Sequence, residues 1–330
     1  RLQIRKRTSD QLLNQFATNG TTFSHSSFDD LDARASFEDA LDWSVDSTQI
    51  SPAPCSLIIE SFDFADFSVS HLSTSTSVTD VYSVPSDTVV LCVARKNMSA
   101  IWNGKRVPPT AMIFSLPGIA HRATLPAGWD SYEFTMSRGL LRQLELLPEG
   151  FFGNFRQPEH ASLMTVESVA SRYLTRLDEF FGRARRHELD DFFESDFLDV
   201  VIKGLREVVA TRLEADDGQS LANTRRADLV AEAAGLVDCR LKSSLSIQNL
   251  CDELGVSPRV LNYAFKDNMG VSPYRYILSR KLGAIRKQLK SSDDPIVEVI
   301  ARYGFETPSR FRRQYHALFG ECPSTTRYGH

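Results

Sequence analysis

The feature that most constrains the fold is a pattern near the carboxyl end that occurs twice. Residues 257–265 recur as residues 307–315, and residues 270–273 recur as residues 320–323, in both cases 50 positions later. Each copy has a hydroxyl residue followed by proline, an apolar pair spaced by four, and a glycine followed three positions on by another proline. A repeat of this period indicates one supersecondary unit used more than once. Two copies predict paired motifs rather than a solenoid.

Each copy is predicted to contain two helices joined by a tight turn. The first helix of each copy ends at a glycine, Gly255 or Gly304, because glycine accepts the left-handed conformation of a sharp C-terminal turn. Ser257 is expected to cap the next helix through its hydroxyl, and a proline suits the first helical turn. Two helices around a short glycine-containing turn are typical of the DNA-binding helix-turn-helix, whose second helix lies in the major groove.

The segment between the copies is predicted to be one continuous helix. Leu278, Leu282, Ile285 and Leu289 recur at helical spacing, which favours a helix from about Pro273 to Lys290. Such a helix would hold the two motifs at a fixed distance. Two recognition helices on one rigid chain would then enter successive major grooves, about 34 Å apart.

These segments together resemble a known family. Residues 255–266, 270–273, 304–315 and 319–327 are similar to the double helix-turn-helix domain of AraC/XylS-family transcription regulators. The resemblance covers the carboxyl-terminal third of the chain and includes every glycine and proline position of the family pattern. It implies a bacterial, cytoplasmic, sequence-specific regulator of promoter DNA, usually an activator, with RNA polymerase as a further partner.

The sequence departs from the family pattern at four positions. Ile285 and Ile300 stand where the family usually has alanine, so overpacking is expected to shift local helix contacts. Lys281 stands where the family usually has arginine. Pro308 falls where relatives often carry a polar reader of bases, which weakens the expectation of a direct contact at the start of that helix.

The outward residues of the two second helices are the candidates for DNA contact. Arginine can bridge N7 and O6 of guanine, asparagine can pair with adenine, and the resemblance implies that bases are read from these positions. The predicted base-contacting residues are Arg259, Asn262, Tyr263, Ser309, Arg310 and Arg313. The predicted phosphate-contacting residues are Ser257, Lys266, Thr307, Arg312 and His316. The alternative is a solvated basic helix face with no ligand.

Charge divides the chain into two halves. Residues 225–330 carry 17 Lys and Arg against 11 Asp and Glu, whereas residues 1–224 carry 21 against 31. Only the carboxyl-terminal half suits a polyanion. Residues 215–224 are polar and without periodicity, so they are predicted to link a sensor or dimerisation domain, residues 1–214, to a DNA-binding domain, residues 225–330.

The front half is predicted to be a cupin-like antiparallel β domain with flanking helices, which makes the whole chain α+β. Short β-rich runs separated by proline and glycine turns occupy residues 50–137. Residues 112–121 are similar to the turn and histidine of cupin-like sensor domains in this family. Residues 138–214 are predicted to be helical, with long apolar stripes over Glu159–Arg185 and Asp190–Leu213. Those stripes either cover the sheet or form a dimer seam.

A ligand pocket in the β domain is a second candidate site. Its predicted lining is Trp102, Phe114, His121 and Trp129, with core packing as the alternative. No metal is expected, because His71 stands without a His-x-His partner and nothing in the spacing brings His25 to His121. No cofactor is expected either. A cupin-like metal enzyme with an appended DNA-binding domain is the alternative to a regulator without enzymatic activity.

The sequence gives little support for a disulfide-rich, zinc-binding or membrane-spanning protein. The five cysteines are far apart, odd in number and without a C-x-x-C pair, which argues against a disulfide framework or a zinc site. No apolar run approaches the roughly 18 residues of a membrane span. The family resemblance implies double-stranded DNA and RNA polymerase as partners, and a small-molecule effector and a second copy of the chain in a homodimer are further expected partners.

Overall fold

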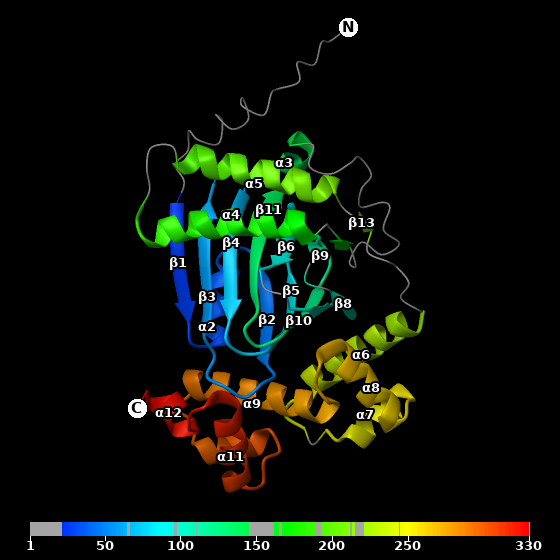
Figure 1. Ribbon diagram of the computed structural model, residues 1–330. Helices are drawn as coiled ribbons and strands as arrows, with labels where there is room; N and C mark the ends of the chain where they lie inside the picture. Colours follow the sequence, from blue (N-terminus) through cyan, green and yellow to red (C-terminus); the bar gives the residue numbers. More distant parts are fainter. Residues whose placement is uncertain are drawn as a thin grey trace.

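The computed structural model describes most of the chain, and Figure 1 shows a β domain stacked on a helical domain. The described residues are 22–64, 67–95, 98–107, 109, 111–144, 162–164, 167–188, 193–211, 213–214, 221–243 and 245–329. Two long helices cover the outer face of the larger sheet, and the carboxyl-terminal helices lie against the opposite end of the β domain. Within these ranges, no helix is both long enough and apolar enough to cross a membrane.

The β domain consists of two antiparallel sheets. One has the strand order β1-β3-β4-β11-β6-β9-β12-β13 and the other the order β2-β5-β10-β7-β8. The strands are β1 (Thr22–Phe28), β2 (Ser44–Gln49), β3 (Leu57–Asp63), β4 (Phe67–Thr74), β5 (Val78–Ser83), β6 (Thr88–Ala94), β7 (Ala100–Trp102), β8 (Lys105–Val107), β9 (Ala111–Ser115), β10 (His121–Leu125), β11 (Asp130–Ser137), β12 (Ser162–Met164) and β13 (Leu213–Glu214). The predicted α+β class and antiparallel β domain are confirmed.

Strand β11 shows how the sequence pattern divides the two faces of the larger sheet. Tyr132, Phe134 and Met136 are buried in the core between this sheet and the covering helices. The residues between them, Glu133 and Thr135, face the space between the two sheets. Because successive side chains of a strand point to opposite faces, one strand serves both the packed core and an internal cavity.

Helices α4 (Glu167–Arg185) and α5 (Phe193–Ala210) cover the sheet with their apolar stripes. Leu177, Phe181 and Phe197 are fully buried there, so the stripes form core within the chain. The prediction of one helix from Glu159 is wrong, because residues 162–164 pair with β9 as strand β12. Similarly, the predicted helix to Leu213 ends at Ala210, and Leu213 belongs to β13. A short helix, α3 (Arg138–Gln143), precedes them.

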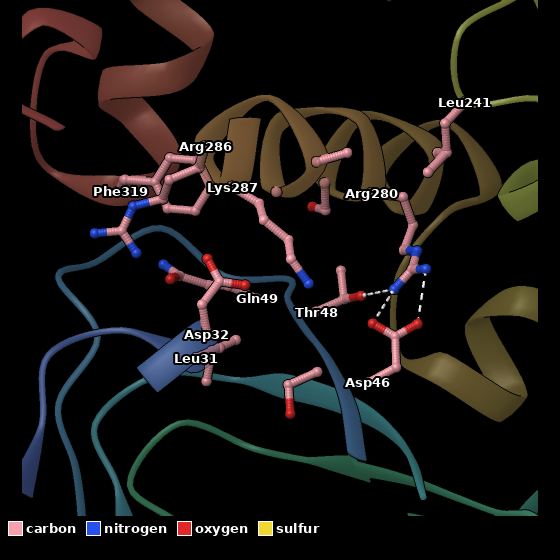
Figure 2. Close-up of a pocket in the computed structure, with 14 residues that line it drawn as sticks. Leu31, Asp32, Asp46, Thr48, Gln49, Leu241, Arg280, Arg286, Lys287 and Phe319 are labelled. Atoms are coloured by element: carbon pink, nitrogen blue, oxygen red, sulfur yellow. Dashed lines mark hydrogen bonds and ion pairs between the residues drawn. The ribbon is translucent and has the colours of Figure 1, made fainter. Parts of the chain in front are cut away.

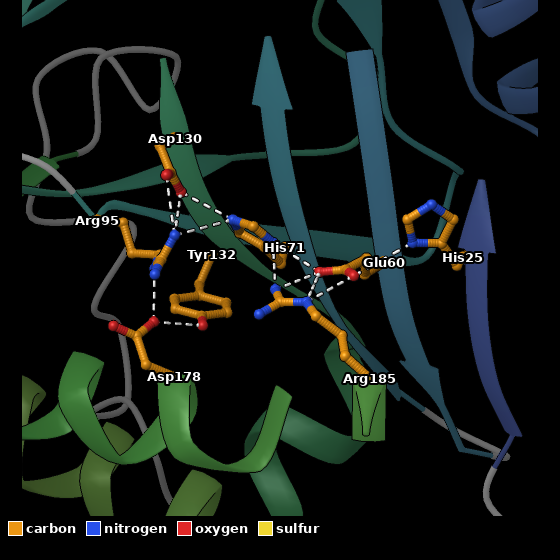
Figure 3. Close-up of polar contacts among 8 residues, drawn as sticks. All are labelled: His25, Glu60, His71, Arg95, Asp130, Tyr132, Asp178 and Arg185. Carbon is orange, nitrogen blue, oxygen red and sulfur yellow. Dashed lines mark hydrogen bonds and ion pairs between the residues drawn. The ribbon is translucent and has the colours of Figure 1, made fainter. Parts of the chain in front are cut away.

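A buried polar network fastens α4 to the sheet (Figure 3). His71 lies between two carboxylates, with Nδ1 2.9 Å from Glu60 Oε2 and Nε2 2.8 Å from Asp130 Oδ1. Arg185 donates to Glu60, and Arg95 donates to both oxygens of Asp130. Both carboxylates therefore already accept hydrogen bonds from guanidinium groups. Neither carboxylate is well placed to bind a metal ion. The described residues include no group of three or more His, Cys, Asp or Glu arranged for a metal.

The helical domain has two cores, one for each copy of the repeated pattern. Its helices are α6 (Leu221–Cys239), α7 (Ile247–Leu254), α8 (Pro258–Met269), α9 (Pro273–Ser291), α10 (Ile296–Arg302), α11 (Pro308–Phe319) and α12 (Pro323–Tyr328). The predicted continuous helix between the copies is α9. Leu282, Ile285 and Leu289 are buried on one side of it, against the second copy.

The amino-terminal part of the β domain contains a helix, α2 (Leu31–Asp39), which closes one end of the space between the sheets. Asp30 caps α2, with its carboxylate accepting from the backbone N–H of Ala33 at 2.9 Å. Residues 215–220 of the predicted linker lie outside the described residues. Helix α6 begins at Leu221, inside the range predicted as linker.

Candidate nucleic-acid interface

Helix α8 is the predicted recognition helix of the first copy. Gly255 ends α7 at φ 63°, in the left-handed region that favours glycine. Ser257 caps α8 by accepting from the backbone N–H of Val260 at 3.3 Å, as expected. Leu261 and Phe265 are fully buried, so the opposite side of the helix faces outward. The hydroxyl of Ser257 is thus already engaged in the helix cap.

The outward side of α8 carries the predicted base-contacting residues. Arg259 is exposed, Asn262 is half-buried, and Tyr263 is 50% exposed. The guanidinium of Arg259 lies 5.6 Å from the centre of the Tyr263 ring, within the range of a cation–π contact. The outward side of α8 therefore presents a cation and an aromatic ring next to each other.

Helix α11 is the counterpart in the second copy. Phe311, Tyr315 and Leu318 are buried, whereas Ser309, Arg310, Arg312, Arg313 and His316 are exposed. Thr307 occupies the N-cap position but makes no side-chain cap hydrogen bond, unlike the serine of the first copy. Its hydroxyl is consequently available at the amino end of the helix.

The start of α9 supports α11 from the side. The Tyr274 hydroxyl accepts from Arg310 Nη2 and from Gln314 Nε2, each at 3.3 Å. Tyr274 is itself 50% exposed and stands close to the outward residues of α11. The contact orients Arg310 without neutralising its charge.

Several cations of the helical domain are paired with carboxylates, whereas the predicted DNA-contacting cations in the described residues are not. Arg240 pairs with Glu253, Arg226 pairs with Asp267, and Arg302 pairs with Asp294. By contrast, five predicted contact residues lie within ion-pair distance of no carboxylate in the described ranges. They are Arg259, Lys266, Arg310, Arg312 and Arg313. Five cations without carboxylate partners on the outward sides of two helices suit a surface that meets phosphates.

The connection between the two copies is rigid. Lys281 of α9 donates to the backbone oxygens of Ser243 at 2.8 Å and Tyr303 at 3.0 Å, which fixes the ends of α10 and of the loop before α7. Burial lowers the pKa of Lys281 below its ordinary value. Ile285 and Ile300 are both buried in the second core.

The β domain contacts both predicted recognition helices at their carboxyl ends. The backbone oxygen of Leu318 in α11 accepts from Gln49 Nε2 at 2.7 Å and from the N–H of Ala53 at 3.3 Å. At α8, a Cβ on Gly104 would lie 2.5 Å from Asn268 Oδ1. The turn between β7 and β8 therefore packs directly on the end of α8. Both contacts lie at the opposite ends of these helices from Arg259 and Arg310.

Between these two contacts, α9 faces the edge of the β domain across a polar cavity of about 240 Å³ (Figure 2). Arg280 donates to Asp46 Oδ1 at 2.9 Å, to Thr48 Oγ1 at 2.8 Å and to Asp238 Oδ1 at 2.8 Å. Further along α9, Lys290 pairs with Asp30, the N-cap of α2. The two domains are thus joined by charged contacts rather than by an apolar core.

Comparison with known proteins gives matches over the helical domain. A family model described as a helix-turn-helix domain matches residues 250–328. The multiple antibiotic resistance protein MarA of Salmonella typhimurium is 34% identical over 87 residues, which are 26% of this chain and 68% of that protein. The chain belongs to the AraC/XylS family of transcription regulators.

Other members of the AraC/XylS family match over the same region. The XylDLEGF operon transcriptional activator 3 of Pseudomonas putida is 36% identical over 93 residues, which are 27% of this chain. The match spans only 28% of that activator's length. Among solved structures, the AraC-like transcriptional activator CuxR covers 80% of this chain at 17% identity, with a TM-score of 0.39, too low to support an argument.

This member of the AraC/XylS family also has a cavity of about 490 Å³ between its two sheets, closed on one side by α2. Of the predicted pocket residues, Trp102 lines the cavity, whereas Phe114, His121 and Trp129 are not among its lining residues. Phe114 lies in the core under α4 and α5. His121 is fully buried, stacks on Tyr82 and is hydrogen-bonded to Asn103 at 3.1 Å.

The charged residues of this cavity were not predicted from the sequence. Arg34 and Glu38 come from α2, Asp63 from β3, Asp80 from β5 and Glu133 from β11. The one signal available in the sequence was Glu133, an acidic residue between apolar neighbours in a predicted strand. Strand alternation places such a residue on the face opposite to the core, but it does not say what lies on that face.

Proposed function

We propose that this chain is a sequence-specific DNA-binding transcription regulator that inserts α8 and α11 into successive major grooves. The observation that carries the proposal is the row of uncompensated cations on the outward sides of these two helices. Phosphates would supply the missing counter-charge, and the released counterions would favour binding. Helix α9 sets the separation of the two helices, and successive grooves on one face of DNA lie about 34 Å apart.

Within this proposal, the outward residues divide into two roles. Arg259, Asn262 and Tyr263 would read one groove, and Ser309, Arg310 and Arg313 would read the next. Hydrogen bonds to base edges distinguish sequences, whereas contacts to phosphates fix the position of the protein. The phosphate contacts would come from Ser257, Lys266, Thr307, Arg312 and His316. For Ser257 we expect the backbone amides at the helix start to contribute, since its hydroxyl caps α8.

We further propose that the β domain is a sensor that responds to a small-molecule effector. Its cavity is within the usual size range of ligand pockets, and its lining includes four aromatic residues, Phe37, Trp43, Tyr82 and Trp102. Helix α2 lines this cavity with Arg34 and Glu38, while its N-cap Asp30 pairs with Lys290 of the helical domain. A ligand that displaces α2 would therefore act directly on α9.

A relative in the same family is named a transcriptional activator. We therefore propose that this chain also activates transcription, in the cytoplasm and in contact with RNA polymerase. We also propose that the chain forms a homodimer, and sedimentation equilibrium tests this by measuring the molar mass in solution. The proposed function includes no enzymatic activity. The cupin-like metal enzyme remains the second candidate, but the carboxylates beside His71 are occupied by Arg95 and Arg185, which disfavours a bound metal there.

Selection of binding sites from random double-stranded DNA tests the proposal. We expect the full chain to enrich a bipartite site with two conserved blocks. The double variant Arg259→Ala/Arg313→Ala should enrich neither block, while Arg226→Ala/Arg302→Ala, which removes two paired cations of the same domain, should enrich both. Recovery of random sequence by the unmodified chain would contradict sequence-specific binding.

A further inference from the structure

The cavity between the two sheets has an aromatic wall. Trp43 stacks on Tyr82 with ring centres 6.2 Å apart, and Tyr82 meets Trp102 edge-to-face at 5.9 Å. All three line the cavity, together with Phe37 of α2. Aromatic faces carry partial negative charge, so they attract cations as well as apolar groups.

The single arginine of the cavity is already neutralised. Arg34 donates from Nε to Glu38 Oε1 at 2.9 Å and from Nη1 to Asp80 Oδ2 at 2.9 Å. All three side chains are buried. With one cation and two carboxylates, this group leaves an excess of negative charge, and Glu38 Oε2 has no hydrogen-bond partner. Arg34 is therefore not available to bind an anion.

A further carboxylate, that of Glu133, faces the cavity from the opposite sheet. Within the described ranges it has neither a hydrogen bond nor an ion pair. Burial raises the pKa of Glu133 to about 7, with Arg34 lowering it and Glu38 and Asp80 raising it further. The other titratable groups that line the cavity are the Asp63 carboxylate, the Tyr82 hydroxyl and the Cys92 thiol. Glu133 is half-buried at the cavity wall, where a carboxylate without a partner can serve as the counter-charge of a bound ligand.

We infer that this cavity binds a small organic cation, an ammonium or amidinium group on an aromatic or apolar body. The cationic group would pair with Glu133, and the body would lie against Trp43, Tyr82 and Trp102. An anionic ligand would add charge of the same sign to a cavity that already has an excess of it. The inference rests on the proposed sensor function, because it names the chemical class of the effector.

Binding of three probes of equal size and different charge tests the inference by titration calorimetry. Benzylamine carries a positive charge, benzyl alcohol none and benzoate a negative one. We expect benzylamine to bind at least tenfold more tightly than benzyl alcohol at pH 8, and benzoate not to bind. Tryptophan emission should change on binding, because Trp43 and Trp102 line the site.

The pH dependence provides a second readout. Only the ionised form of Glu133 attracts the ammonium group, and benzylamine stays protonated over this range. The affinity for benzylamine should therefore rise about tenfold between pH 6 and pH 8, as a carboxyl with a pKa of about 7 ionises. The affinity for benzyl alcohol should change by less than about twofold.

The variant Glu133→Gln keeps the size of the side chain and removes its charge. We expect it to bind benzylamine at least tenfold more weakly and without the pH dependence. Its thermal midpoint at pH 8 should not fall, since a half-buried ionised carboxylate without a partner is removed. The control is Glu207→Gln, which removes the same charge from the exposed outer side of α5 and should leave benzylamine binding unchanged.

Three results would overturn the inference: benzoate binding more tightly than benzylamine, unchanged benzylamine binding by Glu133→Gln, or binding of none of the three probes. DNA binding is measured separately, without any probe, by gel shift. A chain that binds specific DNA but no benzylamine would refute the cation site alone. Conversely, a chain that binds benzylamine but no specific DNA would refute the proposed regulator.

Discussion

Replacing His71 with alanine tests the polar network that fastens α4 to the sheet. Burial lowers the pKa of His71, but the hydrogen bonds to Asp130 and Glu60 outweigh that effect and raise the pKa above its ordinary value. The imidazolium therefore lies between two carboxylates whose side chains are 5% and 3% exposed. Its removal leaves both carboxylates with one cation fewer.

The expected loss follows from these contacts. Each hydrogen bond between charged groups contributes about 1.5–3 kcal/mol, and two are lost. Because Arg95 and Arg185 stay in place, the full cost of an unpaired buried charge, about 3–5 kcal/mol, is an upper limit. We expect His71→Ala to lower the free energy of unfolding by about 3 kcal/mol, or the thermal midpoint by about 6–12 °C.

Thermal unfolding at several pH values measures this loss. Since the folded-state pKa of His71 is raised, its stabilisation is fully present below the unfolded pKa of about 6.5 and is lost as the pH rises through the folded value. The deficit of His71→Ala should thus be larger at pH 6 than at pH 9. Arg172→Ala, which breaks an exposed pair with Glu207, should cost less than about 1 kcal/mol. A deficit for His71→Ala as small as this control, or one independent of pH, would refute the reasoning.

Three further predictions concern the DNA-binding domain. Arg313→Ala should remove about 1–3 kcal/mol of specific binding in a gel shift, with Arg302→Ala unchanged; equal losses in the two would contradict base reading. Lys266→Ala should weaken binding to all sequences alike and reduce the salt slope by about 1, and a sequence-selective loss would argue otherwise. Gly104→Ala, at φ 76° with its new Cβ 2.4 Å from that of Ala227, should loosen the domain contact and speed hydrogen exchange in α6; unchanged exchange would count against that contact.

Much of the helical domain could be predicted because its signals are local. Glycine at positive φ ends α7, Ser257 caps α8, and apolar spacing marks the buried side of α9. Each of these depends on a few neighbouring residues, so one sequence is enough. The β core was also predictable, because Val89–Ala94 is apolar on both faces and lies between two cores, an arrangement that gives a continuous apolar run.

The features that the sequence did not predict depend on contacts between distant segments. Residues 162–164 form β12 only because β9 offers an edge, while their own pattern fits a helix. The charged lining of the cavity combines α2, β5 and β11, which lie far apart in the chain. Among the candidate contact residues, the sequence indicated which face outward but not which lack a carboxylate neighbour. That distinction required Arg226, Arg240 and Arg302 to be placed beside their partners.

The most direct test of the two-groove account is a footprint of the chain on a selected DNA site, repeated with Arg259→Ala and with Arg313→Ala. We expect each variant to lose protection in a different block of the site, with the two blocks separated by about 10–10.5 base pairs, one helical turn. Loss of the same block by both variants, or of neither, would contradict the placement of α8 and α11 in successive grooves.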